Sequence, residues 1–580
     1  MNEASKVAAV PQAAAAVSPG YKWLALSNTT IGVLLATIDS SIMLIAMPDI
    51  FRGIGLDPLA PGSFFYLLWM ILGFQIVSSV LVVSLGRLGD IFGRVRMYNF
   101  GFVVFTIASI GLTVDPFTAQ AGALWLILWR IVQGVGAAFL VANSGAILTD
   151  AFPSNQRGLA LGINNIAGIS GSFIGLVLGG ILAAINWRLV FLVSVPFGIF
   201  GTIWSYLKLR ELSQRRMAKI DWAGNITFAA GLILVMVGIT SGIQPADGHA
   251  MGWTSVPVLS TLGAGVVLLI AFGIIESRVE TPMFRLDLLR IRPFTFGTLS
   301  TFLSAIGRGG LMFMLIIWLQ GIWLPLHGYS FESTPFWAGI LMLPLTCGFL
   351  LAGPLSGFLS DRLGARYFAT GGMIGAAITF ILLMLLPINF NYWGFAAILL
   401  CNGLAMGAFA APNRAAIMNS LPAADRGAGG GMNSTFQNSA QVLSIGIFFT
   451  LMIVGLSSTL STTLVQGLTR HGVPQDVAQH VGSLPPVSIL FAAFLGYNPI
   501  ETLLGPDVLG KLPQADQAAL TGHSFFSDLI SAPFHSGLTE AFIFAAIACL
   551  IAAAASWSRG ERYVNTDRPD HVEAPVALDD

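Results

Sequence analysis

The chain has 580 residues, of which 55% are hydrophobic and only 10% are charged, and its formal net charge is zero. This composition lies outside the range of soluble globular proteins and indicates an integral membrane protein. The zero net charge argues against a nucleic-acid partner, which would need a basic surface to neutralise phosphates. Cys347, Cys401 and Cys549 each lie in an apolar run, so neither a disulfide framework nor a metal site is expected.

Runs of about 20 mostly apolar residues, the length that crosses a bilayer, recur along the chain. Residues 1–21 lack the pattern of a cleavable signal and are interpreted as a cytoplasmic tail. About fourteen spans follow, near residues 23–48, 63–85, 97–114, 122–148, 158–183, 187–208, 222–241, 256–276, 294–318, 335–358, 367–387, 393–418, 428–455 and 536–557.

Lysine and arginine residues fall mostly on one side of these spans. Of the 28 in the chain, 22 lie in segments assigned to the cytoplasmic side, four in outer segments and two, Arg130 and Arg308, within spans. Positive charge is retained on the cytoplasmic side of a membrane protein. We therefore predict a multi-pass protein of the cell (inner) membrane with both termini in the cytoplasm.

Asp39 lies well inside the first span, in the sequence Ala-Thr-Ile-Asp-Ser-Ser. A charged side chain at the centre of a span costs about 2.5 to 3.5 kcal/mol on insertion scales, so this carboxylate needs a partner, water or a proton. One hypothesis is that Asp39 takes up and releases a proton. The alternative is a hydrogen-bond anchor at a helix irregularity.

A charged, glycine-punctuated loop is predicted at residues 86–96, Gly-Arg-Leu-Gly-Asp-Ile-Phe-Gly-Arg-Val-Arg. Its pattern, GxLxDxxGRxR, resembles the loop that marks the major facilitator superfamily, and it is repeated weakly at residues 357–366. The resemblance implies a secondary transporter with a cytoplasmic latch that stabilises its outward-facing state. The latch candidates are Gly86, Asp90, Gly93, Arg94, Asp361 and Arg362.

Span 4 carries Arg130 and Gln133 in Leu-Trp-Arg-Ile-Val-Gln-Gly-Val-Gly-Ala-Ala. The sequence resembles the RxxQGxGAA motif of proton-coupled facilitators, which implies that Arg130 tunes a proton acceptor such as Asp39. An arginine remains charged and can hold a nearby carboxylate ionised. The alternative is a clamp on backbone carbonyl groups.

Span 5 carries Gly171, Gly175 and Gly179 at every fourth position, followed by Gly180. Small residues at this spacing allow close helix packing. The segment resembles the exporter motif GxxxGPxxGG, but Leu176 stands at the proline position. This departure leaves drug:proton exchange and a different cargo both open.

An internal repeat indicates two related halves. Residues 152–164 align with residues 421–433 at an offset of 269, and the two charged loops are offset by 271. Six spans fill only about 200 residues of that offset, so two extra spans are expected between the halves. Residues 219–224 also resemble the linker that enters the extra pair in fourteen-span drug:proton antiporters.

The predicted fold is therefore an all-α integral membrane protein of the major facilitator type, with two six-helix halves and two extra central helices. The substrate site is expected between the halves, near the membrane midplane. The predicted divisions after the first tail are residues 22–208, 209–293, 294–557 and a cytoplasmic tail at 558–580, with a partly helical outer loop at about 456–535.

Arg308 is the least expected residue, because no motif of the resembled family requires a cation in the middle of this span. It could contact an anionic substrate, pair with Asp39 or act as a structural clamp. Other candidates for the substrate cavity are Gln133, Gln437 and Trp69, with interhelical hydrogen bonds or interface anchoring as alternatives.

No nucleotide-binding loop and no hydrolase or metalloprotease motif is found in the sequence, so neither ATP hydrolysis nor enzymatic chemistry is expected. The resemblance implies a monomeric exporter of amphipathic small molecules driven by protons, with no cofactor. An exporter of a specific anionic metabolite, lipid or siderophore is the first alternative. A non-transporting membrane sensor is the second.

Overall fold

The computed structural model describes residues 20–57, 60, 62–153, 156–212, 221–244, 246, 251–279, 282, 284–422, 425–495 and 498–560. Within these residues, fourteen helices are long and apolar enough to cross a membrane, or up to fifteen if a bent pair, α18 and α19, is counted. The predicted all-α membrane fold is confirmed.

The first half contains six spans, and the sixth is interrupted at Val193. Its helices are α1 (Tyr21–Ile54), α2 (Ser63–Phe92), α3 (Arg94–Thr113), α4 (Ala119–Ala151), α5 (Arg157–Ile185), α6 (Leu189–Leu192) and α7 (Ser194–Lys208).

The second half contains the remaining spans of the bundle. The first of them continues from α10 through a π-helix, η2, into α11, and the second is divided into α12 and α13. The helices are α10 (Arg292–Ile317), η2 (Trp318–Trp323), α11 (Leu324–Leu326), α12 (Thr334–Leu341), α13 (Leu343–Leu363), α14 (Ala365–Met384), α15 (Tyr392–Asn419), α16 (Arg426–Ser457) and α22 (Phe525–Ser558).

The helices of the two halves begin at repeated positions. α5 begins at Arg157 and α16 at Arg426, 269 residues apart, while α3 and α14 begin 271 residues apart. These separations equal the two sequence offsets.

The prediction that residues 86–96 form a loop is wrong, because nearly all of them are helical. α2 continues to Phe92 and α3 begins at Arg94, so Gly93 alone separates the two helices. Gly93 has φ 108° and Gly364, at the equivalent corner of the second half, has φ 94°. Side chains rarely adopt this backbone conformation, which is why glycine stands at both corners.

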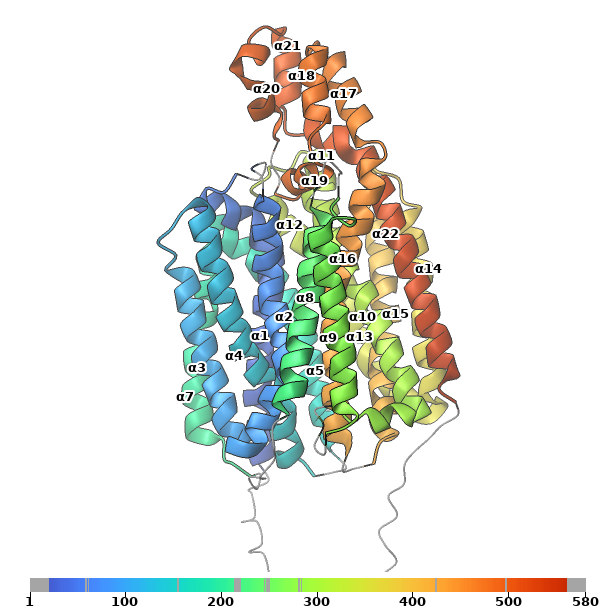
Figure 1. Cartoon of the computed structure of the whole chain (residues 1–580). Helices are drawn as coiled ribbons and strands as arrows, with labels where there is room; N and C mark the ends of the chain where they lie inside the picture. The colour runs from blue at the N-terminus through green and yellow to red at the C-terminus, as the bar shows by residue number, and fades with distance from the viewer. Residues whose placement is uncertain are drawn as a thin grey trace, which may run out of the picture.

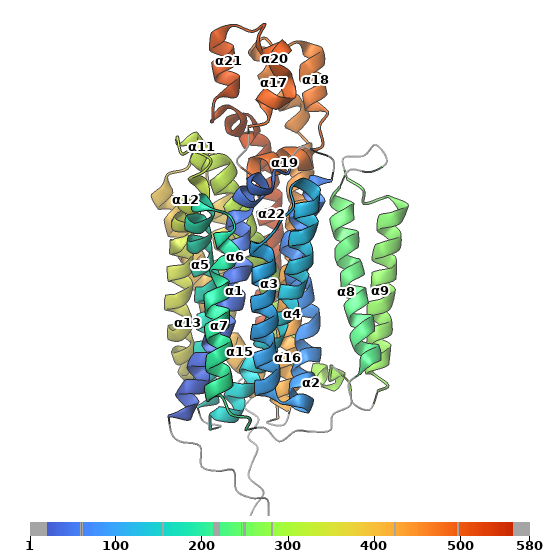
Figure 2. The same ribbon diagram turned by 90° about the vertical axis from the view of Figure 1, so that its left-hand side faces the viewer.

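Two extra spans, α8 (Trp222–Ile243) and α9 (Val256–Glu276), form a hairpin at the edge of the bundle (Figure 2). The Asp221 side chain caps α8 by accepting a hydrogen bond from the Gly224 amide at 2.8 Å. Asn225 accepts a hydrogen bond from Ser84 of α2, and Ile239 packs against Gly446 of α16. The hairpin therefore covers the seam between the two halves on this side, and a 3-10 helix, η1 (Leu286–Arg290), leads from it to α10.

The two ends of the bundle differ. α1 begins and α22 ends at the same end, here called the terminal face (Figure 1). The opposite end, the cap face, carries a helical cap made of α17 (Leu460–Arg470), α18 (Gln475–Gly482), α19 (Pro486–Phe494), α20 (Ile500–Leu509) and α21 (Gln514–Thr521). α22 begins at Phe525, eleven residues before the predicted span, so the segment between spans is shorter than expected.

α19 differs from the other cap helices because it is buried between the two halves. Phe491 packs edge-on against Phe51 of α1 and Phe64 of α2, with ring centroids 5.1 and 6.1 Å away. Phe494 packs 5.7 Å from Phe313 of α10 in the second half. Two prolines begin this helix, since Pro485 is the N-cap and Pro486 the first helical residue.

Candidate functional site

A buried ion pair joins α1 to α4 in the middle of the first half. Arg130 Nη1 donates to one carboxylate oxygen of Asp39 and, at 2.7 Å, to the amide oxygen of Gln133. Gln133 Nε2 donates to the other carboxylate oxygen of Asp39 at 2.8 Å. The exposed fractions of Asp39, Arg130 and Gln133 are 0%, 1% and 0%. Such a sealed charge pair persists because hydrogen bonds satisfy both partners.

Three neighbours fix the orientation of this cluster. Arg130 Nε donates to the Met70 carbonyl oxygen at 3.3 Å, and the guanidinium lies 4.4 Å from the centroid of the Phe74 ring. Gln133 Nε2 also donates to Ser109 Oγ at 3.0 Å. Sequence reasoning missed Ser109 and Phe74, because a serine or phenylalanine in an apolar span carries no signal of such a contact.

The structure brings Asp39, Arg130 and Gln133 together but does not add Arg308 to them. Gln133 was a candidate for the wall of a substrate cavity. Its side chain is fully buried and its amide is bonded to Asp39, Arg130 and Ser109, so the structure does not place it at a cavity wall. The alternative pairing of Asp39 with Arg308 is also not present, because Arg130 occupies that carboxylate.

The glycines of α5 set the position of α1. A Cβ atom added to Gly175 would lie 2.4 Å from the Ile38 carbonyl oxygen, and one added to Gly179 would lie 3.0 Å from that of Ile42. Gly171 similarly faces Thr37 and Leu34 of α1. These contacts allow the backbones to approach closely on either side of Asp39.

The same helix also contacts the second half. A Cβ atom at Gly180 would lie 2.5 Å from the Cα atom of Phe336 in α12. The carbonyl oxygen of Leu176 lies 3.1 Å from the Cβ position of Gly339, also in α12. Leu176, which replaces the expected proline, is therefore part of a close contact between halves.

The Gly93 corner on the terminal face is held by a charge network. Arg94 Nε donates to Asp90 at 2.8 Å, and its Nη1 donates to both oxygens of Asp150 at 2.7 and 2.8 Å. The Glu211 carboxylate accepts from the Arg94 amide at 3.1 Å, at the start of α3 where negative charge is favourable. Sequence reasoning found Asp90 and Arg94 but missed Asp150 and Glu211, which lie far away in the chain.

The other predicted latch residues are placed as follows. Gly86 packs near Ala142, whose Cβ atom lies 3.7 Å from the position of an added Cβ. The Arg362 guanidinium lies 4.9 Å from the centroid of the Phe358 ring. The side chain of Asp361 lies outside the described side chains.

Arg308 is half-buried in α10. Among the described residues, no side chain or carbonyl group forms a hydrogen bond or ion pair with it. The indole nitrogen of Trp69 is buried without a partner, and Gln437 is half-buried on α16.

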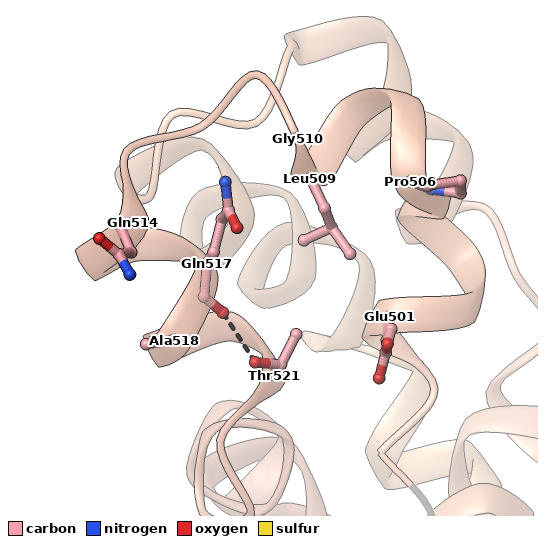
Figure 3. A pocket seen from close by; sticks show the side chains of 8 residues that line it. All are labelled: Glu501, Pro506, Leu509, Gly510, Gln514, Gln517, Ala518 and Thr521. Carbon is pink, nitrogen blue, oxygen red and sulfur yellow. Dashed lines mark hydrogen bonds between the residues drawn. The ribbon is translucent and has the colours of Figure 1, made fainter.

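The cap contains a pocket far along the chain from these residues. It has a volume of about 470 Å³ and is lined by Glu501, Pro506, Leu509, Gly510, Gln514, Gln517, Ala518 and Thr521. Figure 3 shows these side chains around the space between α20 and α21, with Thr521 Oγ1 donating to the Gln517 carbonyl oxygen at 2.9 Å.

Two repeated helical halves with a charge pair sealed inside the first define a membrane transporter. Residues 29–445 match the Major Facilitator Superfamily, so the chain belongs to that superfamily, as its loop motifs predicted.

Relatives of similar length extend this comparison. The chain is 26% identical to the riboflavin transporter RibZ of Clostridioides difficile, covering 74% of this chain and 87% of the relative. It is 27% identical to the multidrug resistance protein Stp of Mycobacterium tuberculosis H37Rv, over 79% of this chain and 80% of that protein. It is 23% identical to the tetracenomycin C resistance and export protein of Streptomyces glaucescens, covering 96% and 95%.

A solved structure supports the fold. The crystal structure of a bacterial homolog to the human lysosomal transporter Spinster, inward-facing and unoccupied, matches with a TM-score of 0.56 and 15% identity. The match covers 95% of this chain and 100% of that one.

Proposed function

We propose that the protein is a proton-driven exporter of amphipathic organic compounds that works by alternating access. The observation that carries the proposal is the sealed Asp39–Arg130–Gln133 cluster inside a facilitator fold. Resistance and export proteins among the relatives support the substrate class.

Asp39 is the proton acceptor in this proposal. Protonation of Asp39 would remove the charge that Arg130 pairs with, and a lone arginine in the membrane interior is costly. The α1–α4 contact would then rearrange. Because α1 also touches α5, α12 and α19, such a rearrangement would reach the cap face of the bundle.

The proposed orientation places the terminal face in the cytoplasm and the cap outside the cell, in the inner membrane. Its support is the distribution of lysine and arginine residues along the sequence. The corner formed by Asp90, Arg94 and Asp150 would then be the cytoplasmic latch. We propose that the exporter is a monomer with small-molecule substrates, protons and lipid as its partners.

The experiment that tests this function measures transport of ethidium, a lipophilic cation, in inside-out vesicles that carry the protein. We expect the wild type to accumulate ethidium when a proton gradient is imposed and a protonophore to abolish the accumulation. Asp39→Asn should reduce it at least about tenfold. That loss corresponds to about 1.4 kcal/mol.

Asp49→Asn is the matched control, because Asp49 is an acid on the same helix whose partner, Arg52, lies 2.5 Å away with an exposed side chain. We expect it to transport ethidium like the wild type. Accumulation by Asp39→Asn at the wild-type rate would overturn the role of Asp39 as proton acceptor.

A further inference from the structure

The arginines in the spans and at their ends differ in whether they have partners. Arg130 is paired with Asp39, Arg414 donates to Asn165 of α5 at 2.9 Å, and Arg559 donates to Asn413 and, at 2.7 Å, to Ser556 Oγ. Arg308 has no such partner among the described residues. A cation left alone in the membrane interior is unfavourable by several kcal/mol, so Arg308 requires a counter-charge or water.

Arg308 lies in a span that is largely buried within the protein. Its span, Arg292–Leu326, has 78% of its most apolar window buried, more than any other span among the described residues. Nevertheless, Arg308 keeps part of its surface exposed, and its nitrogen atoms are not among the buried polar atoms that lack a partner. The guanidinium therefore retains accessible surface, although the span that carries it is largely buried.

The helix face that carries Arg308 is directed towards other polar groups of the second half. One turn earlier, Ser304 contacts the sulfur of Met406 on α15 at 3.8 Å, and Thr301 accepts a hydrogen bond from Asn413 at 2.9 Å. These positions, 301, 304 and 308, follow helical spacing along one stripe. Arg308 is the next position of this stripe towards the cap, and it follows Ser304, whose side chain contacts Met406.

Three glycines beside Arg308 allow neighbouring helices to pack closely against α10. A Cβ atom at Gly310 would lie 2.2 Å from the Phe448 ring, and one at Gly309 would lie 3.2 Å from Gln441 and Ser444 of α16. A Cβ atom at Gly307 would lie 3.6 Å from the sulfur of Cys549 in α22. α10 thus packs closely against α16 and α22, and the stripe that carries Arg308 lies on the side of α10 that meets α15.

We propose that Arg308 binds the anionic group of those transported compounds that carry one, so that the substrates include amphipathic carboxylates or phosphates. This inference rests on the proposed export function and specifies its substrate class. A planar guanidinium with five donors matches a carboxylate or phosphate in a bidentate geometry. Asp39, the acid within α1, is already neutralised by Arg130, so in this proposal the substrate supplies the missing counter-charge.

The test uses the purified full-length protein and two fluorescent probes of one scaffold, 12-(dansylamino)dodecanoate and its methyl ester. We expect the wild type to bind the carboxylate at least about tenfold more tightly than the ester. Arg308→Gln should remove that preference, and Arg308→Lys should retain part of it. Excess acetate should not displace the probe.

Matched controls separate a local loss from misfolding. Arg470→Gln removes an exposed arginine from the cap and should leave the preference unchanged. Asp39→Asn should still bind the carboxylate more tightly than the ester. Vesicles that carry this variant should no longer accumulate the carboxylate in response to a proton gradient. A variant is compared only if it elutes as the wild type does in gel filtration.

The outcomes distinguish this inference from the export function. Equal binding of the two probes by the wild type, or an unchanged preference in Arg308→Gln, would overturn the anion site even if ethidium is exported. If acetate, which has no long apolar chain, displaced the carboxylate probe, the proposal that the substrates are amphipathic would be overturned. The wild type could bind the carboxylate selectively while its vesicles accumulate neither the probes nor ethidium. In that case the export function would be overturned and the anion site would be supported.

Discussion

Asp39 and Arg130 lie 91 residues apart in the chain and form a pair with almost no exposed surface. In water each would be solvated, and in the membrane interior each would be costly by itself. Their mutual contact, together with the two hydrogen bonds of Gln133, makes the burial tolerable. At the scale of residues, the first half is organised around this neutralised pair, whereas in the second half Arg308 has no partner among the residues that the structure describes.

Removing only the cation should destabilise the protein. Arg130→Gln leaves Asp39 buried without its counter-charge, and we expect a loss of about 3 to 5 kcal/mol in unfolding free energy. The double variant Asp39→Asn/Arg130→Gln removes both charges and should recover much of that loss. Thermal unfolding of the full chain in detergent measures both. A double variant as unstable as the single one would contradict a coupled pair.

The helices show how apolar segments with similar composition acquire different roles. α19 is as apolar as many spans but is only nine residues long and begins with two prolines, so it cannot cross the membrane. It is instead buried between α1, α2 and α10, where its phenylalanines meet rings from both halves. At this scale α19 is a wedge that closes the cap face.

Loosening this wedge should act on the cap face alone. Phe491→Ala removes a ring that is 2% exposed and should cost about 3 to 5 kcal/mol locally. We expect faster amide exchange in α19 and at the cap-side ends of α1 and α2. Leu520→Ala, a buried site in α21, is the control and should speed exchange only within the cap. Identical exchange patterns for the two variants would contradict the wedge.

The whole molecule is two halves joined differently at its two faces. At the cap face α19 and the α5–α12 contact lie between the halves. At the terminal face the segment after α9 connects them, since Arg87 of α2 donates to the Pro282 carbonyl oxygen and Arg285 pairs with Asp425 at 2.6 Å. Phe284 of this segment also packs 5.9 Å from Phe436 of α16.

The terminal connection should contribute little to stability, with a defined pH dependence. The hydrogen bond from Arg285 holds the pKa of Asp287 below its usual value. A depressed carboxyl pKa contributes stability above the unfolded pKa of about 3.9, and this contribution is lost as the pH falls through the folded value. Arg285→Gln removes the pairs with both Asp287 and Asp425, and because Arg285 and Asp287 are about half exposed it should cost at most about 2 kcal/mol at pH 7.

Thermal unfolding at several pH values checks this prediction. The difference between Arg285→Gln and the wild type should be constant between about pH 5 and 8, where the carboxylate stays ionised. It should shrink below about pH 4. A difference that grows on acidification would have the wrong sign for this pair.

The sequence by itself determined the number and position of the spans, the repeat and the superfamily. These features depend on local composition, because a span must be long and apolar and a corner such as Gly93 requires a residue that accepts positive φ. The same local patterns identified Asp39 and Arg130 as costly intramembrane charges, before any partner was known.

Only the tertiary structure decided which distant side chains meet. It paired Asp39 with Arg130, assigned Gln133 to that pair, added Asp150 and Glu211 to the Gly93 corner and placed α19 between the halves. It also left Arg308 without a partner among the described residues. Such contacts arise where helices that are far apart in the chain pack together, and no local pattern of hydrophobicity or spacing records them.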